Sequence, residues 1–247
     1  KLGELAFDAA FRLADFGVTG VIGDLSLTDG NFALRVTRKA INGQGTGRLG
    51  GAPATIGWVQ RLDGVQHPTQ FNVKARLTDE SRQALGIDLA SYVTGPIDVD
   101  LRLDGDGAKI ADASGTIDLR AADVAVAALG WRKPAGQPTT ASIQVTERGE
   151  PFAVPRLALR GTGIDAAASG ALTSAGKLDS VTVDHLTVGK TKAIIGDMRK
   201  VDGVWRVRVS GGTLDATGLL KQWLRGGDSK PLPPFVIANT QVERLWL

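Results

Sequence analysis

The chain has 247 residues, of which 43% are hydrophobic and 22% charged, and this length suits one large β domain or two small ones. It contains no cysteine, which excludes disulfides, iron–sulfur clusters and thiolate zinc sites. The net charge is +3, and the basic residues form no long run beside aromatic residues, so the composition argues against nucleic-acid binding.

The first third of the chain alternates apolar and polar residues with the period of a β-strand. The pattern is clear at residues 5–13, 32–38 and 71–77, and Ile56 and Trp58 mark another strand. Each segment has one apolar and one polar face, which favours strands that are buried on one side only.

The period changes after residue 77. Thr78 is a capping residue, helix-forming residues follow to Leu85, and Gly86 ends the segment, so we predict a short helix. Residues 88–93 could add another helical turn before Gly95-Pro96 stops it. We take this interruption as the internal boundary between a first strand block, residues 1–95, and a second, residues 96–247, within one elongated sheet.

The second block resumes the alternation. Residues 97–104 alternate without error, Asp202-Gly203 predicts a hairpin turn, and residues 214–225 predict a second short helix before a last strand from Phe235. We expect about fourteen strands, and we expect them to be antiparallel because no long crossovers separate them. The predicted fold is all-β with two short helices: a long, curved antiparallel sheet of repeated strand modules that forms a hydrophobic groove.

The apolar faces must leave water, and two short helices cannot cover so many strands. A facing sheet, a closed barrel, or a curved sheet that holds apolar ligand chains would each solve this problem. The cleanest apolar faces supply the candidate lining residues of a lipid-binding groove: Val73, Ile97, Val99, Leu101, Leu103, Leu119, Ile143, Val145, Leu157 and Leu159.

No motif indicates catalysis, a metal site or a cofactor. Residues 45–50 match G-x-G-x-x-G, but a strand and not a helix follows, so the context argues against a dinucleotide site. His67 and His185 are far apart in the sequence and accompany no activated serine, so we expect no enzyme. Trp131, beside Arg132 and Lys133, could meet lipid headgroups or a neighbouring segment, or could plug the end of the sheet.

Several segments together carry a family resemblance. They are Arg48 to Pro53 with Trp58, Leu85 to Ile97 with its Gly95-Pro96 strand start, the loop Leu129-Gly130-Trp131-Arg132-Lys133-Pro134-Ala135-Gly136, and Gly211 to Leu220. Their order and spacing over residues 40–247 resemble AsmA-like envelope proteins, especially the large YhdP-type members.

This resemblance implies a section of a periplasmic, bridge-like protein anchored in the inner membrane of a Gram-negative bacterium. Such a protein carries phospholipid between the inner and outer membranes along a hydrophobic β-groove and supports outer-membrane integrity. Its partners would be phospholipid acyl chains, both membranes through segments outside this chain, and envelope proteins. The chain starts in mid-pattern, so we expect a piece of a longer protein. The alternative is a non-enzymatic structural or assembly protein of the envelope, built as a β-sandwich or β-solenoid.

Overall fold

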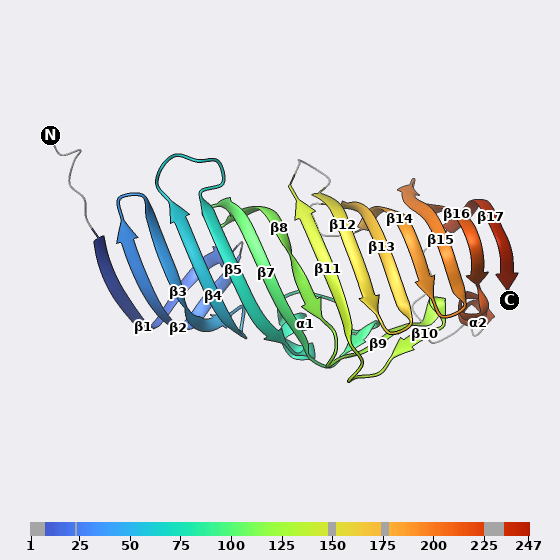
Figure 1. The fold of residues 1–247 in the computed structure, drawn as a ribbon, viewed down its shortest axis with the longest axis horizontal. Helices are drawn as coiled ribbons and strands as arrows, with labels where there is room; N and C mark the ends of the chain where they lie inside the picture. Colours follow the sequence, from blue (N-terminus) through green and yellow to red (C-terminus); the bar gives the residue numbers. More distant parts are fainter. Residues whose placement is uncertain (1–7, 23, 148–151, 174–177, 225–234) are drawn as a thin grey trace. The chain divides into compact units, whose positions relative to one another are not determined.

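A computed structural model describes residues 8–22, 24–147, 152–173, 178–224 and 235–247, and the described chain is almost entirely β (Figure 1). Its main sheet has fourteen strands, and a second sheet has three short ones. The first and last strands of the main sheet, β1 and β17, do not pair with each other, so the sheet is open. This confirms the predicted all-β fold with a long, mostly antiparallel sheet and two short helices.

The chain forms two compact units, residues 1–89 with 96–117 and residues 90–95 with 118–247. The predicted division of the chain into two strand blocks, residues 1–95 and 96–247, remains a prediction.

Unit 1 holds seven strands of the main sheet, in the order β1-β2-β3-β4-β5-β7-β8. Its elements are β1 (Asp8–Ile22), β2 (Leu25–Thr37), β3 (Ala40–Leu49), β4 (Ala52–Arg61), β5 (Thr69–Leu77), α1 (Asp79–Ala84), β7 (Ile97–Asp106) and β8 (Lys109–Asp118). The helix α1 begins as predicted, because the Thr78 hydroxyl accepts a hydrogen bond from the Ser81 amide at 3.3 Å.

Unit 2 holds the order β11-β12-β13-β14-β15-β16-β17 and the three-stranded sheet β10-β9-β6. Its elements are β6 (Val93–Thr94), β9 (Asp123–Val126), the 3-10 helix η2 (Ala127–Leu129), β10 (Trp131–Lys133), β11 (Thr139–Thr146), β12 (Phe152–Gly161), β13 (Ile164–Leu172), β14 (Leu178–Val188), β15 (Thr191–Val201), β16 (Val204–Asp215), α2 (Thr217–Leu224) and β17 (Phe235–Trp246). The predicted hairpin turn at Asp202-Gly203 joins β15 and β16, with φ values of 51° and 80°.

Two local expectations come out differently, and part of a third lies outside the described residues. Residues 88–93 do not extend the helix, because Val93 pairs with Val124 in the small sheet. The last strand is not antiparallel: β17 runs parallel to β16, because the connection through α2 brings the chain back to the start of β16. The start of the predicted first strand, residues 5–7, lies outside the described residues.

Glycines on β3 let large side chains of unit 1 lie across the apolar face of the sheet. Residues directly opposite in an antiparallel pair share a face, and Gly45 stands between Phe32 on β2 and Ile56 on β4. A Cβ atom at Gly45 would come within 2.5 Å of the Phe32 ring and 2.1 Å of the Asn31 carbonyl oxygen. The Phe32 ring therefore occupies the space that a side chain at position 45 would need.

We expect Gly45→Ala to lower the free energy of unfolding by about 1–3 kcal/mol, because the new methyl group overpacks the core against backbone as well as the Phe32 ring. Gly57→Ala is the matched control on β4, since a Cβ there meets no atom closer than 3.7 Å. Urea unfolding of both variants measures the difference. Equal stability of the two variants would contradict this account of the packing.

Candidate functional site

The apolar face of unit 1 is a continuous set of cross-strand rows. One row runs Phe11, Leu34, Gly43, Trp58, Phe71, Leu103, and the next runs Leu13, Phe32, Gly45, Ile56, Val73, Leu101. The opposite face is charged, with ion pairs Lys74–Asp100 at 2.9 Å and Arg76–Asp98 at 3.0 Å between β5 and β7. The two faces differ as the alternation in the sequence predicts.

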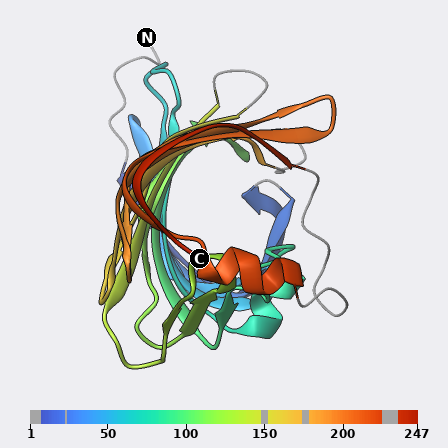
Figure 2. The ribbon, with the colours of Figure 1, turned by 90° about the vertical axis from the view of Figure 1, so that its right-hand side faces the viewer.

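The β1–β2 hairpin bends over this apolar face. Its pairing register shifts at three places between Leu13 and Ile22, and register shifts of this kind bend a strand. Asp15 and Asp29 adopt positive φ values of 51° and 52° near these shifts. Figure 2 shows the end of β1, in blue, turned back toward the strands of its own unit. The hairpin thus covers part of the face from which it starts.

Phe16 fixes the bent hairpin to the core. Its ring meets the Phe32 ring edge-on, with centroids 5.6 Å apart and an interplanar angle of 77°. Phe16, Val21 and Leu25 pack against a buried cluster that contains Leu27, Phe32 and Ile56.

Between the hairpin and the face lies a pocket of about 330 Å³, within the size range of small-molecule sites. None of the described residues that line it is charged: they are Leu13, Phe16, Val18, Gly20, Val21, Leu27, Phe32, Leu34, Ile56, Trp58, Gln60, Thr69, Phe71, Gly107 and Ala108.

The polar side chains in this lining bind to groups of the protein itself. The Thr69 hydroxyl donates to the Gln60 side-chain oxygen at 2.6 Å and accepts from the Gly107 amide at 2.8 Å. The Gln60 side-chain nitrogen donates to the Arg61 carbonyl at 3.3 Å. An occupant therefore meets an apolar wall, which favours a hydrocarbon ligand over a polar one.

The predicted lining residues in unit 1 lie beside this pocket and not in its lining. Val73 and Leu103 belong to the buried cluster, and Leu101 packs against it. Ile97 and Val99 are buried further along β7, at 3% and 9% exposure. Leu13, Phe32 and Phe71 of the lining stand in segments where the alternation is clear, but the sequence does not show that the bends at Asp15 and Asp29 fold the hairpin over them and so form the pocket.

The predicted lining residues in unit 2 are more exposed. Leu119 is buried, but Ile143, Val145 and Leu159 are half-buried and Leu157 is 42% exposed. Ile143 pairs with Leu157 across β11 and β12, so they share a face. The same row continues through Ala168, Val183, Gly196 and Val209, of which all four are half-buried. This unit thus has an apolar wall that protein atoms cover only in part.

Trp131 and Lys133 are buried in β10. Trp131 is 7% exposed, which fits the interpretation that it plugs the end of a sheet. Lys133 is fully buried, and its ammonium group donates to the carbonyls of Leu119, Ala122, Gln137 and Arg120 at 2.6, 2.7, 3.2 and 3.4 Å. Burial lowers the pKa of Lys133. No sequence pattern indicates this burial, because a lysine in a turn-rich segment is normally exposed.

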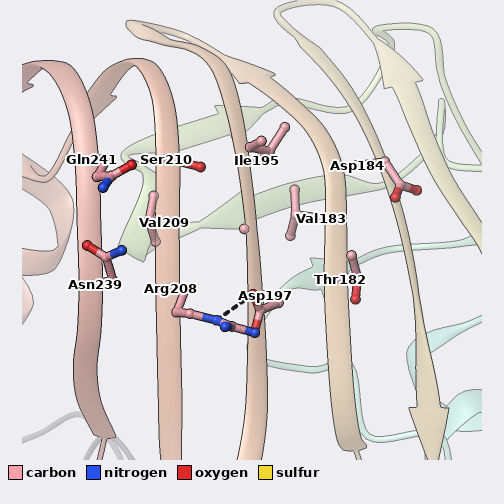
Figure 3. Close-up of a pocket in the computed structure, with 11 residues that line it drawn as sticks. Thr182, Val183, Asp184, Ile195, Asp197, Arg208, Val209, Ser210, Asn239 and Gln241 are labelled. Atoms are coloured by element: carbon pink, nitrogen blue, oxygen red, sulfur yellow. Dashed lines mark hydrogen bonds and ion pairs between the residues drawn. The ribbon is translucent and has the colours of Figure 1, made fainter.

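The polar face of unit 2 carries a second, shallower hollow of about 550 Å³ over β14 to β17. Figure 3 shows Arg208 and Asp197 paired in it, with Thr182 on one side and Asn239 on the other. Ser210 and Gln241 line it further along the same strands.

The described residues contain no group of three or more His, Asp or Glu side chains that could hold a metal ion. His185 lies 3.0 Å from Asp165, and this contact lowers the pKa of the Asp165 carboxyl, but both side chains are exposed. His67 lies in a loop with a φ of 53°. Among the described residues, no helix has the length and apolar character to cross a membrane.

No family model matches the chain, and no curated protein or solved structure is significantly similar to it.

Replacing Lys133 tests whether its hydrogen bonds to backbone carbonyls hold β10 against the segment 119–122. We expect Lys133→Met to lower the free energy of unfolding by about 3 kcal/mol, because it leaves buried carbonyls without a donor. Lys192→Met, at an exposed position of β15, is the control. Equal unfolding midpoints of the two variants would contradict this role.

The contribution of Lys133 to the free energy of unfolding should depend on pH in a defined direction. Burial lowers the pKa of Lys133 in the folded state below its ordinary value of 10.5. Between those two values the unfolded state binds more protons, so the stability contributed by this group rises with pH across that window. We therefore expect the stability gap between the wild type and Lys133→Met to widen as pH rises toward 10.5, measured by urea unfolding. A gap that narrows would contradict the burial of the charged form.

Proposed function

We propose that the chain is a section of a lipid carrier that binds phospholipid acyl chains on the apolar face of its sheet. The observation that carries this proposal is the pocket of unit 1: its described lining residues include none that is charged, and their polar side chains bind to the protein itself. Such a wall recognises hydrocarbon by burial and shape, and it binds no headgroup.

The half-buried wall of unit 2 supports the same proposal. Ile143, Leu157, Val183 and Val209 present branched aliphatic side chains in one cross-strand row, with the small residues Ala168 and Gly196 between them. Contact with an acyl chain would remove this surface from water at about 25 cal/mol per Å². The binding is therefore passive: it requires no chemical step, and the chain acts as a binding surface and not as an enzyme.

The resemblance to AsmA-like envelope proteins extends the proposal to a cellular role. On that basis the chain belongs to the periplasmic part of an inner-membrane-anchored protein that passes phospholipid between the inner and outer membranes. The partners would then be lipid acyl chains, the two membranes and further envelope proteins.

Quenching of tryptophan fluorescence by phospholipids with brominated acyl chains tests the proposal, because Trp58 lines the pocket. We expect brominated lipid to quench the fluorescence of the wild type. In Trp58→Phe, the part of the quenching that comes from Trp58 should disappear. Val18→Asp should raise the lipid concentration needed for half-maximal quenching about tenfold, because it puts a carboxylate into the apolar lining.

Leu62→Asp is the control for Val18→Asp. Leu62 is 51% exposed and Val18 46%, and Leu62 lies outside the pocket lining. The proposal fails if brominated lipid leaves the fluorescence unchanged, or if both aspartate variants weaken the quenching equally.

A further inference from the structure

An arginine pair on the polar face of unit 2 has no counter-ion among the described residues. Arg199 on β15 stands directly opposite Arg206 on β16, in a stretch of the ladder without a register shift. Both side chains are exposed, and neither forms an ion pair within the described part of the chain. Like charges that face each other across two strands destabilise the pair, so this arrangement is costly without an anion.

The acidic side chain in the next row of this face is already engaged. Asp197 lies opposite Arg208, two residues further along the same ladder. Its carboxylate accepts from the Arg208 Nε at 2.9 Å and from a terminal guanidinium nitrogen at 3.0 Å. Asp179 and Asp202 stand near the ends of these strands, and neither is ion-paired with the two arginines. The face therefore keeps two guanidinium groups available.

The polar hollow lies next to this pair. Arg208, Asp197 and Asp184 line it, and Asn239, Ser210 and Gln241 bring amide and hydroxyl groups from β16 and β17 (Figure 3). The rows alternate across the strands, so Arg199 and Arg206 stand on the same face as Asp197 and Arg208, two residues along. An anionic group held by the arginines would thus have hydrogen-bonding side chains beside it for a polar substituent.

We propose that this face of β14 to β17 binds a phosphate ester with a hydroxyl-bearing substituent, its phosphate on Arg199 and Arg206 and its hydroxyl groups in the hollow. Guanidinium groups suit phosphate because each offers parallel N–H donors to two oxygens. The amide and hydroxyl side chains can donate to and accept from hydroxyl groups. The ester is either a soluble molecule or a lipid headgroup. The site lies on the opposite face from the apolar wall, so it does not depend on the proposed acyl-chain function.

Thermal melting at low salt tests both halves of the proposal in the full chain. Without ligand, Arg206→Gln should raise the melting temperature, because it removes the like-charge contact. Glycerol 3-phosphate, used as the probe, should raise the melting temperature of the wild type. Titration calorimetry should show affinity for this probe about tenfold weaker in Arg206→Gln. Arg156→Gln, an exposed arginine on β12, is the control for both readouts.

Vesicles distinguish the two sources of the ester. Co-sedimentation with phosphatidylcholine vesicles that contain phosphatidylglycerol, lost in Arg206→Gln, assigns the site to a lipid headgroup. Binding of glycerol 3-phosphate without vesicle binding assigns it to a soluble ester. The proposal is overturned if neither probe binds, if Arg156→Gln weakens binding as much as Arg206→Gln, or if Arg206→Gln lowers the melting temperature of the unliganded chain.

Discussion

The structure depends on one constraint: nearly every strand has one apolar face, and each such face must leave water. Burial of that surface is the main favourable term in folding, and the three short strands of the second sheet are too few to cover the fourteen strands of the main sheet. The two units meet this constraint differently. In unit 1 the β1–β2 hairpin turns back over the face, and in unit 2 the face stays half-buried. The candidate ligand surfaces lie where this cover is incomplete.

The one-sided pattern was readable from the sequence because it is local. Residues 97–104 alternate without error, and in β7 the apolar positions Ile97, Val99 and Leu103 are buried. Their charged neighbours form cross-strand pairs such as Lys74–Asp100. The short helix after Thr78 was equally local, because one capping hydroxyl and a glycine define its ends. Period and capping therefore sufficed for the fold class.

What depends on contacts between distant residues could not be read in this way. The pocket of unit 1 needs the bends at Asp15 and Asp29, which appear in the sequence only as interruptions of the pattern. The burial of Lys133 needs carbonyls from residues 119–122 and 137 to converge on one point, and carbonyls leave no mark in a sequence. The Arg199–Arg206 contact needs the register of the β15–β16 hairpin, which the turn at Asp202-Gly203 sets.

The two faces of unit 2 divide recognition by chemistry. The apolar wall that includes Leu157 can bind only by burial, which is weakly selective because hydrocarbon chains differ little in surface per carbon. Under the proposed phosphate-ester site the polar face would select by charge and hydrogen bonding, because Arg199 and Arg206 stand opposite each other there and amide and hydroxyl groups line the hollow. In a one-layer sheet these functions are separated by the thickness of a single strand. A substitution on one face therefore leaves the side chains of the other in place, and each can be tested while the other serves as its internal reference.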